Sequence, residues 1–238
     1  MYEMNEKIRY SETDSTGGLT VPALLNYFQD CSFSHSQALG VGWRYLKNLN
    51  LAWVLSACQI CINKMPMVGD EVVVQTWPYE FKGFYGLRNF SLNDTNGERI
   101  AYANSIWVLI DTKTGRPARI PETVSGAYTN EPPIDMVCSE RKIVVPKEYE
   151  KMPPIPVQKY FIDTNHHVNN EKYVMIAQEF LQDGYTIEEI RVEYKKAAVL
   201  NDVLYPRVTR EAERTTVVLA NEDGQPYAIV LFIVKRDI

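Results

Sequence analysis

The sequence predicts an α+β protein in which one series of elements occurs twice. Each half opens with a polar turn, continues into an amphipathic helix and ends in several strands joined by turn residues. Setting Asp14 on Asp163 also places Gln29 on Gln178 without a gap. The apolar pairs that then coincide are Leu19 with Val168, Leu25 with Val174, and Tyr27 with Ile176. The common order of elements and the common register favour an internal duplication.

The first helix is expected at residues 20–39, where side chains suited to a core recur at spacings of three and four. Thr20 stands at the capping position, Pro22 falls in the first turn, and Gly40 follows the last turn. A short extended run at residues 8–10 and a glycine-containing turn precede this helix.

Strands are expected in most of the remaining sequence, because runs rich in β-branched and aromatic residues alternate with turn residues. In the first half they are predicted at residues 53–64, 71–80, 86–92 and 99–109. In the second half we predict a strand at 160–162, a helix at 170–181, and strands at 189–194, 203–210, 215–220 and 227–234.

Proline is concentrated between the two halves and restricts the backbone there. We therefore expect an N-terminal domain at residues 1–125, a proline-rich linker at 126–156 and a C-terminal domain at 157–238. Proline and charge together predict that the linker is a semi-extended strap over the surface.

Composition limits the class of protein. A net charge of −5 and a pI near 5.4 argue against a nucleic-acid-binding protein. The N-terminus lacks the features of a signal peptide, and no apolar run approaches the roughly 18 residues of a membrane span. Four unevenly spaced cysteines do not form a disulfide framework. We expect a cytoplasmic protein with reduced thiols and no membrane association.

One polar stretch gathers side chains that can transfer protons and donate hydrogen bonds. Asp163, Asn165 and His167 lie just before the second helix, which Asn169 or Asn170 can cap. Free N–H groups at a helix start favour developing negative charge. Spacing alone leaves two interpretations open: a catalytic set, or an Asx turn that caps the helix and carries surface histidines.

The stretch Asp163-Thr-Asn-His-His-Val-Asn-Asn-Glu-Lys-Tyr173 resembles the motif Asp-x-Asn-x-His-Val-Asn-Asn-x-Lys-Tyr of the acyl-acyl carrier protein (ACP) thioesterase family. Further segments resemble that family in the same order along nearly the whole chain. They are Leu51-Ala-Trp-Val54, Pro66-Met-Val-Gly-Asp70, Thr76-Trp77, Ser105-Ile-Trp-Val108 and Arg119-Ile-Pro-Glu122.

The resemblance implies two tandem hotdog domains, each a long helix wrapped by a curved antiparallel sheet. In such a pair Asp163 would hold or activate the attacking group, Asn165 would position it, and His167 would act as general base or orienting partner. Backbone N–H groups near residues 168–170 would polarise the thioester carbonyl. Gly18 stands at the position of His167 in the other copy, so one working site per chain is expected.

The activity implied is hydrolysis of acyl-ACP to free fatty acid and ACP, without metal or organic cofactor. The acyl chain would lie in the N-terminal domain, and the phosphopantetheine-bearing carrier would dock on basic residues of the C-terminal domain. Candidate acyl-chain contacts are Leu24, Phe28, Trp53, Leu55 and Trp107, each of which also suits an ordinary core. Candidate docking residues are Arg191, Lys195, Lys196, Arg207 and Arg210, which also suit a solvated face.

Two alternatives stay open: an acyl-coenzyme A thioesterase, and a hotdog protein that binds acyl groups without cleaving them. Chain length, saturation and a homodimeric state are also left open by the sequence.

The sequence departs from the family at one informative place. After the strand the family often has Glu-Tyr-Arg-Arg-Glu-Cys, whereas this chain has Glu-Tyr-Lys-Lys followed by Ala197 and Ala198. Neither a cysteine nucleophile nor a carboxylate base can act from those positions. Asp163 must then carry more of the mechanism, or another carboxylate substitutes, Glu193 being the nearest candidate.

The other histidines and cysteines do not predict a metal site. His166 is expected to be solvated, and His35 to lie in the core or beside an acyl channel. Cys58 and Cys61 lie within a strand and have no second pair, so core packing is expected.

Overall fold

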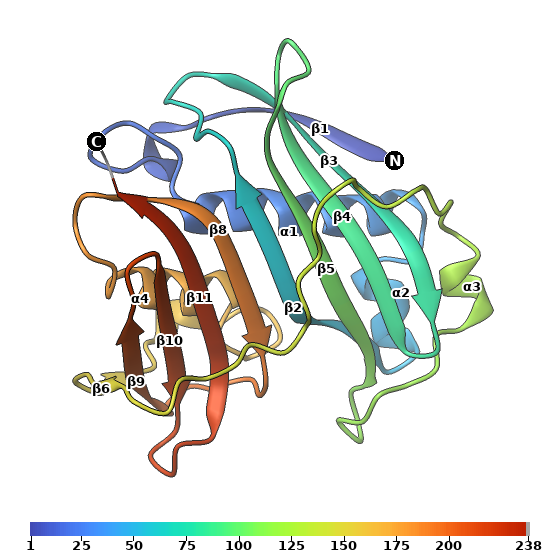
Figure 1. Ribbon diagram of the computed structural model, residues 1–238. Coiled ribbons are helices and arrows are strands. Elements are labelled where there is room, and N and C mark those ends of the chain that lie inside the picture. Colours follow the sequence, from blue (N-terminus) through green and yellow to red (C-terminus); the bar gives the residue numbers. More distant parts are fainter. Residues whose placement is uncertain (237–238) are drawn as a thin grey trace. The chain divides into compact units, whose positions relative to one another are not determined.

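The computed structural model describes residues 1–236, and the chain divides into two compact units. The first unit comprises Met1–Ser56 and Ile62–Cys138, and the second comprises Ala57–Cys61 and the chain from Ser139 onward. Each unit has a helix against an antiparallel sheet, which confirms the α+β hotdog class (Figure 1). Within the described chain, no helix combines the length and apolar character needed to cross a bilayer.

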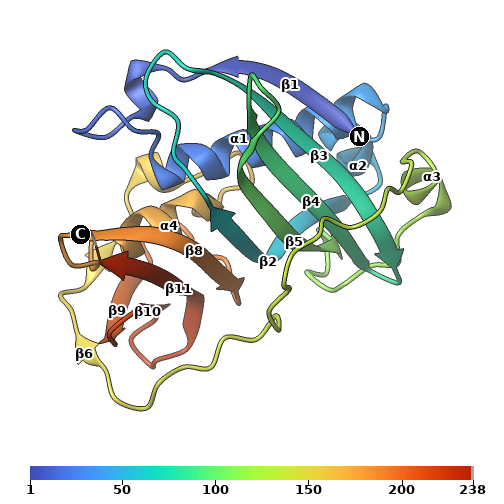
Figure 2. The same ribbon diagram turned by 45° about the horizontal axis from the view of Figure 1, so that its top comes forward.

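The first unit has strand order β1-β3-β4-β5-β2. Its elements are β1 (Tyr2–Lys7), the 3-10 turn η1 (Tyr10–Glu12), α1 (Val21–Ala38), α2 (Trp43–Asn48), β2 (Leu51–Ile62, in part), β3 (Glu71–Lys82), β4 (Tyr85–Asp94), β5 (Arg99–Asp111) and α3 (Glu122–Ser125). In Figure 2, α1 runs along one face of β3, β4 and β5. The four long strands and the first helix were predicted to within two residues at each end.

The start of α1 follows from its sequence. The Thr20 hydroxyl accepts a hydrogen bond from the N–H of Ala23 at 3.3 Å, and Pro22 occupies the first turn, where it sacrifices no helical hydrogen bond. The buried residues of the helix recur at spacings of three and four, so one face packs on the sheet. Phe28 on that face stacks on Phe90 of β4, with ring centroids 5.1 Å apart.

Farther along the same face, α1 meets a buried guanidinium. One Arg88 nitrogen lies 3.2 Å from Nδ1 of His35 and donates to the Thr76 hydroxyl at 3.0 Å. The Arg88 guanidinium also lies over the ring of Tyr128, at 5.4 Å from its centroid. Burial, Arg88 and the N-terminal amine together lower the pKa of His35 to about 4, so the imidazole is neutral in the core.

The lowered pKa predicts acid-sensitive stability. An unfolded chain protonates His35 near pH 6.5, whereas the folded chain resists protonation until about pH 4, so stability is present above pH 6.5 and lost as the pH falls. We expect His35 to account for about 2 kcal/mol of lost unfolding free energy between pH 7 and pH 5. Urea unfolding of wild type and His35→Gln at both pH values measures this. Equal losses in the two proteins would contradict the assignment.

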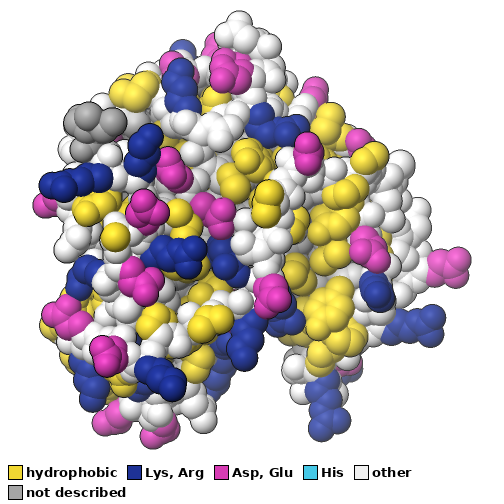
Figure 3. All heavy atoms as spheres, viewed as in Figure 1, with side chains coloured by type: hydrophobic (Ala, Val, Ile, Leu, Met, Phe, Trp, Pro, Cys, Tyr) yellow, Lys and Arg dark blue, Asp and Glu magenta, His cyan; other side chains and the backbone are white. Residues whose placement is uncertain are grey.

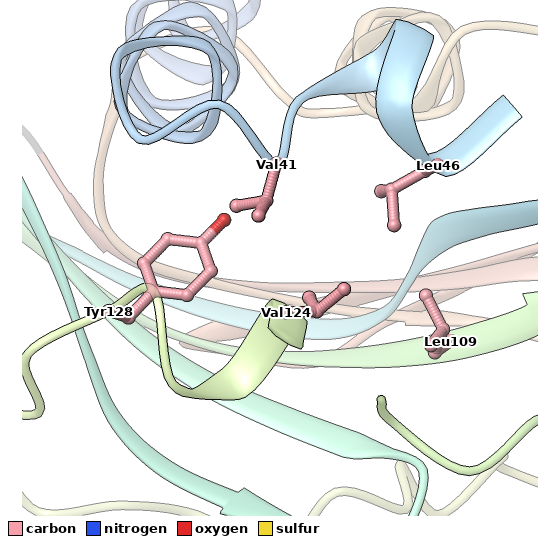
Figure 4. Packing of buried hydrophobic residues seen from close by; sticks show 5 residues of the cluster. All are labelled: Val41, Leu46, Leu109, Val124 and Tyr128. Atoms are coloured by element: carbon pink, nitrogen blue, oxygen red, sulfur yellow. The ribbon is translucent and has the colours of Figure 1, made fainter. Parts of the chain in front are cut away.

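Two short helices, α2 and α3, were not predicted. Their side chains meet in one apolar cluster with β5, comprising Val41, Leu46, Leu109, Val124 and Tyr128 (Figure 4). Helices of four to six residues are unstable in isolation and depend on such packing, which local sequence periodicity does not report.

The second unit has strand order β8-β11-β10-β9-β6. Its elements are β6 (Glu150–Lys151), β7 (Ile155–Pro156), the 3-10 turn η2 (Lys159–Phe161), α4 (Asn170–Gln178), β8 (Tyr185–Tyr194), β9 (Val203–Arg210), β10 (Arg214–Ala220) and β11 (Pro226–Arg236). Ala57–Cys61 of β2 belongs to this unit and pairs antiparallel with Glu189–Glu193 of β8.

Three local predictions were wrong in detail, and the strand predicted at residues 189–194 begins four residues earlier, as β8. Residues 160–162 do not form a strand: η2 occupies this region, burying Phe161 and leaving Tyr160 exposed. The run expected at residues 8–10 likewise ends in η1. The second helix ends at Gln178 instead of residue 181, because the chain continues in turns with i to i−3 hydrogen bonds.

The segment after Cys138 forms a strap over one face of the second unit's sheet. The N–H of Ser139 donates to the Gln59 side chain at 2.8 Å, and the Arg191 guanidinium donates to the Glu140 carbonyl. Ile143 is 3% exposed and packs on an apolar cluster of β10 and β11. This segment is therefore anchored by specific contacts and follows the sheet, although it has no regular structure.

Candidate active site

The turn before α4 is built around the Asp163 carboxylate. Its Oδ1 accepts hydrogen bonds from the N–H groups of Asn165 at 2.7 Å and His167 at 3.2 Å. The Asp163 N–H donates to the His167 carbonyl at 2.8 Å, which closes the turn. Asp163 therefore has a structural role whatever its chemistry, because it fixes the backbone that carries the other two candidates.

The first unit contains the same turn before α1. Asp14 Oδ1 accepts from the N–H groups of Thr16 at 2.8 Å and Gly18 at 3.2 Å, and the Asp14 N–H donates to the Gly18 carbonyl at 2.9 Å. Hydrogen bonds from Thr16, partly offset by desolvation, hold the pKa of Asp14 below its usual value. The matching hydrogen bonds support the internal duplication.

The two turns differ in their side chains, not in their backbone. Gly17 has φ +84° in the first turn, and His166 has φ +63° at the matching position, a conformation that is uncommon for a residue with a side chain. His166 is exposed, as expected. Only the second turn carries an amide and an imidazole, so chemistry requiring these groups is restricted to one copy.

The structure brings the three candidate catalytic residues together unequally. The Asn165 amide lies 3.4 Å from Asp163 Oδ2 and both are on the surface side of the turn. His167 touches Asp163 through its backbone N–H alone, and its exposed imidazole makes no hydrogen bond within residues 1–236. A substrate could therefore reach the imidazole without first displacing a protein partner.

The backbone donors expected at the helix start are largely used within the protein. The Val168 N–H donates to the Ala198 carbonyl at 2.9 Å, and the Asn169 N–H donates to the Phe161 carbonyl at 2.8 Å. The expectation that these two groups polarise the thioester carbonyl is therefore wrong. Asn169 does occupy the N-cap position, although its side chain makes no capping hydrogen bond.

Ala197 and Ala198 lie beside this turn. The Ala198 carbonyl accepts from Val168, and its N–H donates to the Tyr173 hydroxyl at 2.8 Å. In the family a carboxylate and a thiol often occupy these two positions. This chain has methyl groups there instead: Ala197 is exposed and Ala198 is buried.

Glu193 does not replace the missing carboxylate. Its Oε2 accepts from the N–H of Ile143 in the strap at 3.2 Å, and its Oε1 pairs with Lys195. The next residue, Tyr194, donates to the Asn170 carbonyl of α4, so by strand alternation Glu193 points to the opposite face of the sheet. The suggestion that Glu193 is the base is therefore wrong.

Replacement of Glu193 by Ala is accordingly expected to leave thioester hydrolysis unchanged within about twofold. The N–H of Ile143 would lose its acceptor in a buried setting, so the unfolding free energy should fall by about 1–3 kcal/mol. Kinetics and urea unfolding, with the exposed Glu188→Ala as control, measure both quantities. A large loss of turnover in a folded Glu193→Ala variant would show that Glu193 takes part in the reaction.

Family models match both halves of the chain. The model described as the acyl-ACP thioesterase N-terminal domain matches residues 1–128, and the model of the acyl-ACP thioesterase C-terminal domain matches residues 145–230. The chain belongs to the acyl-ACP thioesterase family. Family membership confirms the resemblance drawn from the motif of residues 163–173 and its companion segments.

Similar proteins include plant members of the acyl-ACP thioesterase family. The palmitoyl-acyl carrier protein thioesterase of Gossypium hirsutum is 26% identical over 227 residues, covering 88% of this chain and 55% of that protein. The oleoyl-acyl carrier protein thioesterase 1 of Arabidopsis thaliana is 27% identical, covering 89% of this chain and 64% of that protein. The chain spans about half the length of the palmitoyl-acyl carrier protein thioesterases that it matches.

Solved structures support the fold. An acyl-ACP thioesterase from Bacteroides thetaiotaomicron has a TM-score of 0.89 at 23% identity, covering 98% of this chain and 97% of that chain. The 12:0-ACP thioesterase from Umbellularia californica has a TM-score of 0.86 at 22% identity, covering 99% and 97%.

The acyl-chain candidates of this family member all lie in the first unit, but in two groups. Leu24 and Phe28 are almost fully buried on the sheet-facing side of α1. Trp53 is partly buried and adjoins Phe81, with centroids 6.3 Å apart. Trp107 is also partly buried and donates to the Ser105 hydroxyl, and Leu55 is buried in β2. Neither tryptophan is fully packed, so these side chains have more freedom to adapt to a ligand than Leu24 or Phe28.

The five docking candidates are not gathered in one patch. Arg191 donates a hydrogen bond to the strap. Arg207 lies opposite Val218 in the β9–β10 register, on the face of the sheet that the strap covers. Arg210 donates to the Phe180 carbonyl on the helix side. The other two, Lys195 and Lys196, directly precede the alanines beside the Asp163 turn. In Figure 3, basic and acidic side chains are interspersed over the strands of the second unit.

Among the described residues, no group of three or more His, Cys, Asp and Glu side chains is arranged to hold a metal ion. His35 is buried in the core of the first unit, which agrees with its expected placement.

Proposed function

We propose that this protein hydrolyses acyl-ACP to free fatty acid and ACP, with the acyl chain in the N-terminal unit and the reaction in the C-terminal unit. The observation that carries the proposal is the turn of residues 163–167 within a chain of this family. This turn presents the Asn165 amide and the unpaired His167 imidazole. The turn before α1 has the same backbone hydrogen bonds but carries neither group.

The reaction requires that water add to the thioester carbonyl and that the C–S bond then break. A base takes one water proton, the carbonyl oxygen carries negative charge in the intermediate, and the departing thiolate receives a proton, giving a carboxylic acid and a thiol. We assign Asp163 and Asn165 to orienting the water or carbonyl, and His167 to proton transfer.

Carrier recognition is proposed to involve Lys195 and Lys196, because they lie at the strand end beside the turn. Lys196 would attract an acidic carrier more strongly than Lys195, whose ammonium is already paired with Glu193. The four free cysteines suit a reducing compartment, in keeping with a cytoplasmic location.

The test is a panel of acyl-ACP substrates of graded chain length, with the released acid identified by mass spectrometry. We expect free acid from at least one member, and little from an Asp163→Ala variant. Comparing the rates for the same acyl group on ACP and on coenzyme A shows which carrier the enzyme prefers. Stable ACP binding without acid release would favour the non-catalytic alternative, to which the absent Glu-Cys pair lends support.

A further inference from the structure

A buried carboxylate in the first turn of α4 has no role in the mechanism described so far. Glu171 is only 5% exposed, and its Oε1 lies 2.7 Å from Nζ of Lys172. Its Oε2 is the one buried side-chain nitrogen or oxygen atom in residues 1–236 that has no hydrogen-bond partner. A buried, unpaired carboxylate oxygen is costly, so such an atom calls for a functional explanation.

The position of Glu171 in the helix directs it toward the turn. In an α-helix each Cα–Cβ bond tilts toward the N-terminus, so a side chain in the first turn leans over the residues that precede the helix. For Glu171 those residues are the turn that carries His167, four positions earlier in the chain. The positive end of the helix dipole also favours an ionised carboxylate there.

Tyr194 contacts the first turn of α4 and is influenced by the charge of Glu171. Burial raises the pKa of Tyr194 well above its ordinary value, and the charges of Cys58, Tyr173 and Glu171 act in the same direction. The Tyr194 hydroxyl donates to the Asn170 carbonyl at 3.1 Å. Tyr173, two residues after Glu171, in turn accepts a hydrogen bond from the N–H of Ala198 at 2.8 Å.

The sister copy lacks this pair of charges. In the register that sets Asp14 on Asp163, Pro22 stands at the position of Glu171 and Ala23 at that of Lys172. The first turn of α1 therefore forms with proline and alanine at these positions and needs no carboxylate there. A buried ion pair is also rarely a gain in stability over apolar residues of similar size. The start of a helix thus does not require a carboxylate at this position, and Glu171 occurs only in the copy that carries His167.

We propose that Glu171 is the catalytic carboxylate that holds and deprotonates the attacking water, replacing the glutamate that the family has at the position of Ala197. The inference rests on the proposed hydrolase function. Oε2 accepts a hydrogen bond from the water and takes its proton as the water oxygen bonds to the thioester carbon. When the C–S bond breaks, the proton passes to the thiolate sulfur, directly or through His167, so Glu171 is ionised again for the next cycle.

Lys172 has a supporting role in this scheme. Its ammonium on Oε1 stabilises the ionised form of Glu171 and leaves Oε2 for the water. In Lys172→Met, Oε1 loses its partner, so the carboxylate should lose its fixed position. We expect kcat to fall by at least about tenfold with KM nearly unchanged, a split that loss of packing alone would not produce.

The deciding experiment is the pH profile of Glu171→Gln on the acyl-ACP substrate that wild type hydrolyses best. We expect kcat to fall by at least about 100-fold with KM nearly unchanged, and the acid limb to flatten. Glu179→Gln, an exposed glutamate directly after the same helix, is the matched control and should keep the wild-type profile. Thermal unfolding of each variant establishes that it is folded.

Each outcome bears on the inference. A folded Glu171→Gln variant with kcat within threefold of wild type and the same acid limb would overturn it. Should that variant not fold, the kcat of Lys172→Met decides, and a value within threefold of wild type would overturn it equally. Failure of the wild type to release acid from any acyl-ACP would instead contradict the proposed hydrolase function. The role of Glu171 and the hydrolase function are therefore tested by different results.

Discussion

Replacement of Asp163 by Asn is expected to lower kcat for acyl-ACP hydrolysis by about 10²-fold, the loss associated with misplacing a reacting group by about 1 Å. The substitution removes the negative charge next to the reacting groups while keeping an oxygen that can accept the N–H groups of Asn165 and His167. The turn should therefore persist, and the loss should appear in kcat. Steady-state kinetics with the preferred acyl-ACP measures it.

Asp14→Asn is the matched control for this prediction. Asp14 forms the same turn with the same hydrogen bonds in the first unit, so the substitution has the same local structural consequence without a neighbouring imidazole. Turnover should be unchanged. If both variants lost activity equally, the effect of Asp163 would be structural. If neither did, the proposed site would be wrong.

Local features of this fold could be predicted from the sequence because neighbouring residues determine them. The Thr20 cap, the Asp-centred turns and the strand alternation all act over a few residues, and each occurs where the sequence places it. The duplication was also visible, because the register of Asp14 on Asp163 is preserved in the hydrogen bonds of both turns. The boundaries 1–125, 126–156 and 157–238 and the roles of the site residues stay predictions.

The features that the sequence did not reveal depend on contacts between distant segments. Glu193 is turned away from Asp163 by its hydrogen bond to Ile143, fifty residues earlier in the chain. The Val168 N–H is taken up by Ala198, and no local pattern announces that pairing. Glu171 was passed over because the motif allows any residue at its position. The near-complete burial of its side chain and the unpartnered Oε2 make it informative, and only the fold defines them.

Phe28→Ala is expected to lower the unfolding free energy by about 3–5 kcal/mol, the usual cost of truncating a well-packed aromatic side chain. Phe28 is 3% exposed and stacks on Phe90, so alanine would leave a cavity between α1 and β4. Urea unfolding gives the free energy. Phe33→Ala on the same helix is the control, because its side chain is 51% exposed and its loss should cost within about 0.5 kcal/mol.

This measurement also separates the two roles open to Phe28. As a core residue it contacts protein atoms on all sides, so truncation should be costly and should leave the chain length of the released acid unchanged. As a channel residue it would contact the acyl chain on one side, so truncation should cost less and favour longer or bulkier substrates. The stacking on Phe90 and near-complete burial favour the core role, whereas the partly exposed Trp53 and Trp107 are the better candidates for the acyl-chain contacts. A destabilisation of less than about 1 kcal/mol, accompanied by a shift in product length, would reverse that assignment.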